Sequence, residues 1–177
     1  SGIGPLAFTP ITYITNEIIV TSLNNDGILE WSNVIPKEQQ VTVTQFSIGL
    51  VGSGSNGSVS VSVGLLFPIA VLGSGPEFLS GLPMYENGKL SVIINDDPKN
   101  IGITDIDDVK KVRNVNKMIP VIFEFDESGK MTRIDPDDFE RKQIVVRPSV
   151  YYRVSNEEYI IYGSNKEGER LGTLKID

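Results

Sequence analysis

The chain has 177 residues, of which 40% are hydrophobic and 22% charged, a composition typical of one globular domain that can bury a core. It contains no Cys and no His, which excludes disulfides, Ser-His-Asp and Cys-His catalysis, and the usual zinc, copper and haem ligand sets. The net charge is −7 and no basic stripe occurs, so we expect no nucleic-acid partner. The longest apolar stretch, Val63–Leu72, contains Pro68 and is shorter than the roughly 20 residues of a membrane-spanning helix, so we expect no membrane span.

Residues 1–14 form an apolar and extended N-terminal segment. The chain begins with Ser1-Gly2-Ile3 rather than with Met, which we interpret as the start of a processed, secreted chain. Pro5 and Pro10 lack a backbone N–H, so a strand in this segment belongs at the edge of a sheet. The segment is therefore predicted to be either the first strand of its own domain or a strand donated to a neighbouring subunit. Residues 15–177 are predicted to form a single β-sandwich domain.

The region from Gln39 through Pro76 contains no charged residue. Within it, Ser58–Phe67 alternates apolar residues with Ser and Gly, a period of two that predicts a β-strand. In Val41–Leu50 the apolar positions change phase, and a β-bulge near Thr44-Gln45 would keep both sets facing the core. A run of Gly, Ser and Asn, Gly52–Gly57, predicts the hairpin loop between these two strands.

Turn residues separate the other predicted strands, and Asn87-Gly88 is the favoured two-residue hairpin turn. These strands are Ile18–Ser22, Ile28–Trp31, Leu90–Ile94, Val121–Phe125, Met131–Ile134, Ile144–Val154, Tyr159–Tyr162 and Leu171–Ile176. Helix is predicted only in Thr104–Val112 and in one turn that begins at Asp135. The fold class is therefore predicted to be all-β, an antiparallel β-sandwich of jelly-roll type with one or two short helices.

Several Asp residues close together in the sequence could coordinate a Ca²⁺ ion, which takes six to eight oxygen ligands. They are Asp96, Asp97, Asp105, Asp107 and Asp108. Their spacing does not match an EF-hand loop, and the simpler interpretation is a turn followed by a helix N-terminus, where acidic residues are favourable. The same interpretation applies to Asp135, Asp137 and Asp138. We expect no other cofactor.

The sequence does not indicate an enzyme. A pair of carboxylates on a sandwich could hydrolyse a glycosidic bond, but the acidic residues fall at turns and helix starts, and Trp31 is the only Trp that could form a sugar subsite. A carbohydrate-binding module would share the architecture and would expose aromatic residues. The candidates are Tyr151, Tyr152, Tyr159 and Tyr162. Alternation in Val150–Tyr162 more simply places some of them in the core and others in cross-strand pairs, so a glycan partner stays open.

The uncharged strand Ser58–Phe67 is unusual for a free monomer, which normally protects exposed strand edges with Lys, Pro or bulges. It is predicted either to lie covered at the centre of a sheet or to meet another subunit. The apolar N-terminal segment is consistent with the second alternative. The residues predicted at a subunit interface are Leu6, Phe8, Ile11, Tyr13, Val59, Val61 and Val63.

Three features together give a resemblance to known proteins: the apolar start Leu6–Ile14 without a Met, the hairpin Val41–Leu66, and closing strands rich in Tyr, Val and Ile. With them the chain resembles secreted jelly-roll subunits of extracellular fibres, namely the TasA-like biofilm fibres of bacteria and the archaeal bundling pili and threads. The resemblance implies that an N-terminal strand inserts into the next subunit and builds head-to-tail polymers. The pattern is also similar to jelly-roll proteins of virions, such as capsid, turret or spike subunits.

These observations predict a self-assembling structural subunit of an extracellular filament, in which copies of the chain join by β-strand addition without catalysis. The predicted partners are other copies of the chain. Two alternatives stay open, a viral capsid or turret protein located in the virion, and a carbohydrate-binding adhesive module. The first would need the context of a capsid, and the second would bind glycan as a monomer.

Overall fold

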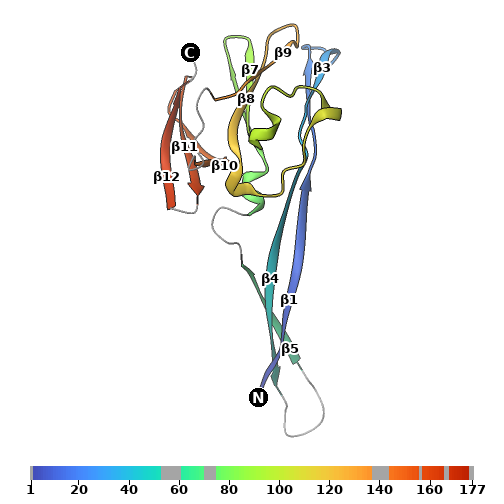
Figure 1. The fold of residues 1–177 in the computed structure, drawn as a ribbon, viewed down its shortest axis with the longest axis vertical. Coiled ribbons are helices and arrows are strands. Elements are labelled where there is room, and N and C mark those ends of the chain that lie inside the picture. Colours follow the sequence, from blue (N-terminus) through green and yellow to red (C-terminus); the bar gives the residue numbers. More distant parts are fainter. Residues whose placement is uncertain are drawn as a thin grey trace.

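The structure, a computed structural model, describes residues 2–52, 61–69, 75–136, 144–155, 157–165 and 168–175, and its regular structure consists of β-strands and short 3-10 turns (Figure 1). The strands are β1 (Gly2–Thr15), β2 (Ile18–Leu23), β3 (Leu29–Ile35), β4 (Gln39–Gly52), β5 (Val61–Ile69), β6 (Gly81–Glu86), β7 (Lys89–Asp96), β8 (Ile119–Phe125), β9 (Met131–Ile134), β10 (Val145–Arg153), β11 (Glu158–Asn165) and β12 (Gly168–Lys175). The helical pieces are the 3-10 turns η1 (Pro76–Phe78), η2 (Pro98–Asn100), η3 (Ile106–Asp108) and η4 (Val115–Lys117).

The first four strands form one long antiparallel ribbon. β1 pairs with β4 and β2 pairs with β3, so residues 2–23 run back along residues 29–52 from end to end. At about 3.3 Å per residue, the ribbon is about 70 Å long. Its turn is stabilised by the Asn24 side chain, whose Oδ1 accepts hydrogen bonds from the backbone N–H groups of Asp26 and Ile28, both at 2.9 Å.

The pairing of the ribbon is interrupted near its middle, where Asn16 and Glu17 lie opposite residues 36–38. The second segment has one residue more than the first, which is the definition of a bulge. The interruption is bridged from outside the ribbon, because Val112 donates to the Glu38 carbonyl and accepts from the Gln40 N–H, both at 2.8 Å. The bulge therefore marks the level at which the ribbon is tied to the rest of the chain.

Above the bulge the strands are stacked in three layers, visible side by side in Figure 1. The central layer is the sheet β6-β7-β8-β9, the hairpin β2-β3 covers one of its faces, and the sheet β10-β11-β12 covers the other. Alternate residues of β8 point to the two sides. Val121, Phe123 and Phe125 pack toward β2-β3, whereas Ile122 packs toward Tyr159 and the β10-β12 layer.

Trp31 fixes the β2-β3 hairpin on the central sheet. Its ring stacks on Phe125 with centroids 5.8 Å apart and planes 10° from parallel, and its Nε1 donates to the Glu127 carbonyl at 3.1 Å. The neighbouring Asn33 side chain donates to the Gly129 carbonyl at 3.0 Å. β3 therefore lies over the β8-β9 side of the sheet.

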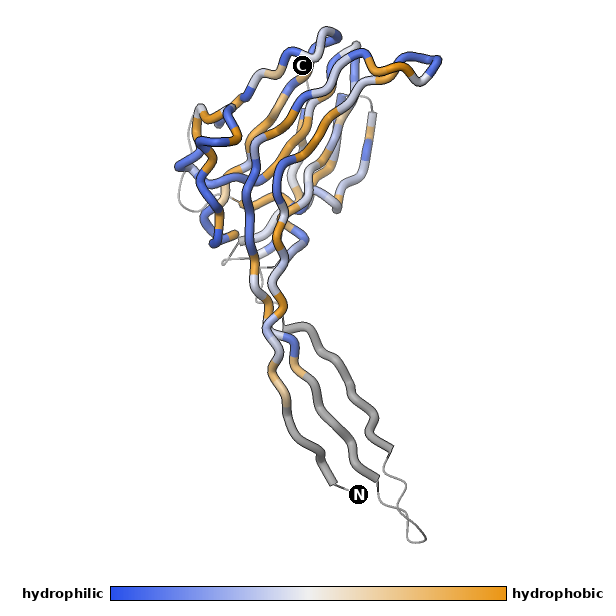
Figure 2. The backbone as a smooth tube through the Cα atoms, turned by 90° about the vertical axis from the view of Figure 1, so that its right-hand side faces the viewer, coloured by the Kyte–Doolittle hydropathy of each residue, from blue (hydrophilic) through white to orange (hydrophobic). Residues whose placement is uncertain are grey.

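Below the bulge the ribbon leaves the body as an arm, defined here as the three-stranded sheet β1-β4-β5. Figure 1 shows it extending away from the layered body, and Figure 2, turned by 90°, shows the base of β1 and β4 leaving the same end of the body. Among the described side chains of the arm, those at its base pack on the body. Ile11, Val41 and Val43 join a hydrophobic cluster there, whose other members are Phe78, Leu79, Val112, Val115, Met118 and Val145.

The all-β sandwich class is confirmed, the jelly-roll order is not confirmed, and the helix predicted over Thr104–Val112 needs correction. The described strands β6–β9 and β10–β12 follow one another as meanders, so they do not confirm a jelly roll. The helix expected over Thr104–Val112 is only the single 3-10 turn η3. The Asp105 side chain caps this turn by accepting from the Asp107 N–H at 3.0 Å, and Val112 is drawn instead into its bridge with Gln39.

The predicted bulge at Thr44-Gln45 is wrong. The β1–β4 register runs without a shift from Leu6↔Ile48 to Thr15↔Gln39. The change of apolar phase has another cause, since Val41 and Val43 face the body whereas Phe46, on the other face of the strand, stacks beside Phe8 with centroids 5.2 Å apart. The apolar face of the ribbon thus changes sides where the arm leaves the body.

The hairpin predicted between the two uncharged strands is confirmed, with β4 and β5 paired from Thr44↔Ile69 to Gly52↔Val61. Its predicted loop, Gly52–Gly57, lies outside the described residues apart from Gly52. A central position for the second strand is excluded among the described strands, because β5 pairs only with β4 and lies at the edge of the arm.

Replacing Trp31 by Ala should lower the free energy of unfolding by about 2–4 kcal/mol, because the stacking on Phe125 and the hydrogen bond to Glu127 are both lost. Urea unfolding followed by far-UV circular dichroism measures the change. Tyr152→Ala, which removes an aromatic ring that is 68% exposed, is the matched control and should change it by less than about 0.5 kcal/mol. Equal effects of the two substitutions would contradict the clamping role of Trp31.

Candidate assembly surface

The arm carries no charged residue, since none occurs in β1, β4 or β5. It also has two strand edges without a partner among the described strands, the outer edge of β1 and the outer edge of β5. Such edges present rows of unpaired N–H and C=O groups, which monomeric proteins usually protect with charge or by covering them. The arm therefore has open strand edges and lacks the charged side chains that would prevent another strand from pairing with them.

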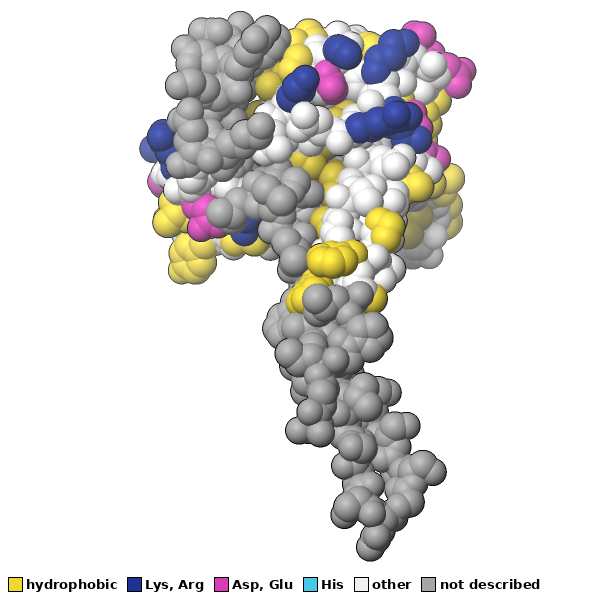
Figure 3. Space-filling view, turned by 60° about the horizontal axis from the view of Figure 1, so that its bottom comes forward, with side chains coloured by type: hydrophobic (Ala, Val, Ile, Leu, Met, Phe, Trp, Pro, Cys, Tyr) yellow, Lys and Arg dark blue, Asp and Glu magenta, His cyan; other side chains and the backbone are white. Residues whose placement is uncertain are grey.

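Apolar side chains are exposed where the arm leaves the body. Phe8 is 65% exposed and Ile14 58% exposed, and Tyr13 is also on the surface. Figure 3 shows hydrophobic side chains gathered at this neck, whereas the charged side chains in this view lie on the body. This distribution separates a charged, solvated body from an apolar surface at the start of the arm.

The structure describes only some of the side chains predicted at a subunit interface. Phe8 and Tyr13 are exposed on β1, but Ile11 packs against the hydrophobic cluster at the base of the arm. Leu6 lies on β1, Val61 and Val63 lie on β5, and Val59 lies outside the described residues.

A groove runs along the free edge of β2, on the body just above the arm. It has a volume of about 670 Å³ and is lined by the backbone segment Thr15–Thr21 on one side and by Gly81 and Pro83 of β6 on the other. Leu90 and Val92 of β7 also line it. Both bordering strands are unpaired on the side of the groove, because β2 pairs only with β3 and β6 only with β7. No sequence pattern indicated this groove, since it depends on which strand edges the fold leaves open.

Lys37 lies at the inner end of the groove and is only 3% exposed. Its Nζ donates a hydrogen bond to the Leu79 carbonyl. Burial lowers the pKa of Lys37 from 10.5 to about 8, against the attraction of the Asp96 carboxylate, which favours the charged amine. Lys37 belongs to the bulge of the ribbon. Its burial could not be predicted from the sequence, because a lysine that follows a proline between two strands is usually exposed.

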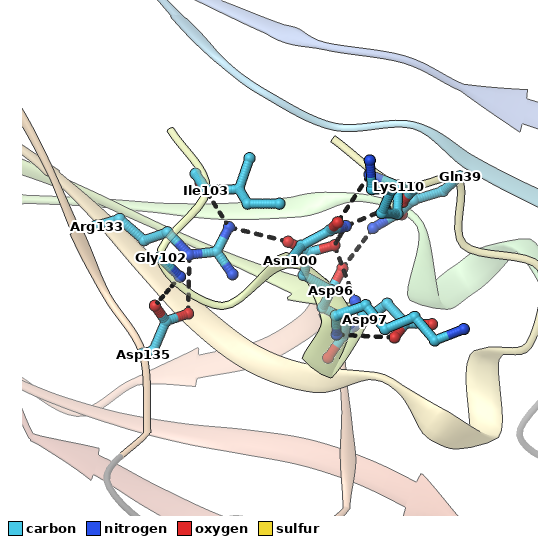
Figure 4. A network of polar contacts seen from close by, with 11 residues as sticks. Gln39, Asp96, Asp97, Asn100, Gly102, Ile103, Lys110, Arg133 and Asp135 are labelled. Carbon is cyan, nitrogen blue, oxygen red and sulfur yellow. Dashed lines mark hydrogen bonds and ion pairs between the residues drawn. The ribbon is translucent and has the colours of Figure 1, made fainter. Parts of the chain in front are cut away.

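A network of buried polar groups fixes the base of the arm and the loop between β7 and β8 (Figure 4). Arg133 Nη1 lies 3.0 Å from Asp96 Oδ2, and its Nε lies 2.8 Å from Asp135 Oδ1. Asn100 donates to Asp96 at 2.7 Å and to the Lys110 carbonyl at 3.0 Å. Burial raises the pKa of Asp96, although the hydrogen bond from Asn100 and the charge of Arg133 oppose that shift.

Asn95, next to Asp96 in β7, joins three separate segments. Its Nδ2 donates to the carbonyls of Phe78, at 2.9 Å, and Val146, at 2.7 Å, and its Oδ1 accepts from the Val146 N–H at 3.0 Å. Its own carbonyl accepts from the side chain of Gln39, the first residue of β4. The arm therefore starts from a fully buried amide contact with the central sheet.

The acidic residues considered for Ca²⁺ have separate roles in the structure. Asp96 pairs with Arg133, Asp97 caps the turn η2, and Asp105 caps η3. Asp107 and Asp108 lie exposed in η3. Among the residues that the structure describes, no three acidic side chains form a group that could hold a metal ion. Asp137 and Asp138 lie outside the described residues.

The four tyrosines considered for glycan binding do not share one surface. Tyr151 and Tyr152 are exposed, whereas Tyr159 is buried between the layers and its ring lies 6.2 Å from that of Tyr151. Tyr162 is half-buried, with the Arg147 guanidinium 5.0 Å from its ring centre.

Comparison of the chain with protein-family models, with curated proteins and with solved structures finds no match. Within the described ranges, the structure has no helix with the length and apolar character needed to cross a membrane. The function must therefore be inferred from the arm, its edges and the groove.

Stability should depend on pH through Lys37. Because its pKa is lowered on folding, the unfolded chain binds more protons between pH 8 and pH 10.5, and the free energy of unfolding rises with pH across this window. Relative to Lys37→Met, the native chain should gain about 3 kcal/mol between these two pH values. Urea unfolding of both proteins at several pH values measures it. A difference between the two proteins that does not vary with pH would contradict a buried amine with this pKa.

Proposed function

We propose that this protein is a self-assembling structural subunit whose copies join by β-strand addition through the arm, and that the product is an extracellular filament. The observation that supports the proposal most is the arm itself, an uncharged three-stranded sheet with two open edges that leaves the body. A sheet of three strands needs a packed hydrophobic face or further strands to be stable in water. Pairing with another copy would satisfy its edges.

The two open edges of the arm are different, which permits a head-to-tail contact between copies. The arm presents β5 at one edge, whereas the opposite edge is formed by β1 and continues into β2. A contact that joins one edge of a copy to the other edge of the next uses two different surfaces. Such a heterologous contact propagates into a filament unless the rotation between copies closes a ring.

The net charge of −7 is also consistent with this arrangement. Repulsion between like-charged bodies opposes unspecific clustering, while the uncharged arm can approach another copy without such a cost. The proposal requires no catalytic group and no bound metal.

The proposal is tested by electron microscopy and sedimentation of the purified full chain. Filaments that form without any other component are the expected result. Protein that stays monomeric over the accessible concentration range would contradict the proposal and favour a glycan-binding module, and closed shells would favour a virion component.

A charge placed on the arm should impair assembly. Phe8→Lys introduces a cation on the exposed face of β1 and should raise the concentration needed for assembly at least about tenfold, since an unpaired charge would be desolvated at the contact. Leu171→Lys is the matched control, because Leu171 is 73% exposed on β12, a strand of the body. Normal filaments from Phe8→Lys at wild-type concentrations would contradict a role of the arm surface.

A further inference from the structure

The groove beside β2 has the form of a missing strand. The central sheet has four strands, but the layer on this face has only two, β2 and β3. β3 lies over β8 and β9 through Trp31 and Asn33. β2 lies over β7, because Val20 packs in the same cluster as Val92 and Ile94.

The place over β6 is left uncovered. On the other face of the central sheet, Leu82 and Met84 of β6 are buried against the β10-β12 layer. On the groove side, Pro83 and Tyr85 are exposed, and their cross-strand partners Val92 and Leu90 line the groove or pack at its margin. A third strand beside β2 would cover these apolar residues and pair with the open backbone edge of β2.

Such a strand must have one apolar face and must not bring an acidic side chain to Glu17, an exposed charged residue of the groove lining. Lys37, the other charged residue of the lining, offers no free charge, since it is buried and its amine donates to the Leu79 carbonyl. An uncharged strand meets these conditions. The groove floor is apolar, whereas the outer side of the layer is open to solvent at Ile19 and Thr21. An occupant therefore needs apolar residues at every second position and small or polar residues between them.

The edge strand β5 fits these requirements. Val61, Val63 and Leu65 alternate with Ser62 and Gly64, and the strand carries no charge. This alternating part, residues 61–65, spans about 17 Å and is long enough to pair with five of the seven residues Thr15–Thr21 that border the groove, whereas Leu66 and Pro68 end the alternation.

The same copy cannot fill its own groove. In the arm, β4 and β1 stand between β5 and the edge that continues into β2. The arm also points away from the body that carries the groove. The occupant must therefore come from a second copy of the chain.

We infer that the groove between β2 and β6 is the acceptor site for β5 of a second copy, which adds to the free edge of β2 as the third strand of the layer. The inference rests on the proposed function and specifies its contact. Each copy then carries one donor, β5, and one acceptor, the groove, on opposite edges of the same ribbon. Every contact in the polymer is identical and head-to-tail.

Disulfide trapping tests this contact directly, because the chain contains no Cys and each variant carries a single thiol. Thr21→Cys, at the groove, is mixed with one member of a series of Cys variants along β5, and the mixture is oxidised during assembly. A disulfide requires Cα atoms within about 7 Å. Covalent dimers are expected between Thr21→Cys and only some positions of the series, and none with Thr132→Cys, an exposed control on β9. The series is Ser62→Cys, Gly64→Cys and Leu66→Cys.

A second variant pair tests the groove without cross-linking. Pro83→Glu places a charge on the exposed floor of the groove and should raise the concentration needed for assembly at least tenfold. Leu171→Glu carries the same charge on β12 and should assemble like the wild type. Unchanged unfolding transitions of both variants establish that the fold is retained.

Three outcomes would overturn the inference. Dimers that form between Thr21→Cys and Thr12→Cys, but not with the β5 series, would assign β1 as the donated strand. Filaments of normal length from Pro83→Glu, without any cross-link to Thr21→Cys, would exclude the groove while the proposed function stands. Wild-type protein that never assembles would overturn both.

Discussion

The unpaired backbone groups at strand edges are the constraint on which this structure depends. Every N–H and C=O group of a β-strand needs a partner, from a neighbouring strand or from water. The ribbon of residues 2–52 satisfies one side of each of its strands internally and leaves the outer sides to be satisfied elsewhere. On the body, the open edge of β2 borders the groove. In the arm, the open edge of β1 is the outer edge of the three-stranded sheet.

Burial divides the ribbon into a fixed half and a projecting half. Val20 and Ile35 anchor the upper half on the central sheet, and Val41 and Val43 anchor the base of the arm. The amide contacts of Asn95 hold the same level of the molecule, and each such hydrogen bond contributes about 1 kcal/mol while an orphaned buried amide would cost more. The arm thus has a defined origin on the body, which a projecting element needs if it is to reach the same place on every neighbouring copy.

Local sequence patterns predicted the strands and turns well where one face is buried and the turn chemistry is specific. Met131–Ile134 has the same bounds in the structure, and Asn87-Gly88 forms its turn with φ values of 48° and 78°. The sequence could not show that β1 and β2, and likewise β3 and β4, continue one ribbon. In the sequence, the residues around Asn16 and Pro36 resemble ordinary ends of separate strands. The changed apolar phase at Phe46 was attributed to a bulge, since the sequence does not reveal that the body ends there and that the apolar face changes sides.

The candidate site was only partly accessible from the sequence for the same physical reason. Absence of charge from Gln39 through Pro76 was consistent with a covered central strand or with a surface that meets another chain, and the choice between them depends on tertiary structure. Lys37 and Pro83 line the same groove only because the ribbon lies over β7 and leaves one face of β6 uncovered. The role of Asp96 could not be predicted either, because its ion-pair partner Arg133 lies on β9, far from it in the sequence.

The most direct test of assembly through strand edges is hydrogen–deuterium exchange of the full chain, compared between the dilute monomer and the assembled state. The account predicts that backbone amides of β2 and β5 exchange much more slowly in the assembly, because their open edges become paired, while those of β8, in the central sheet, change little. Exchange in β2 and β5 that is as fast in the assembled protein as in the monomer would contradict the account.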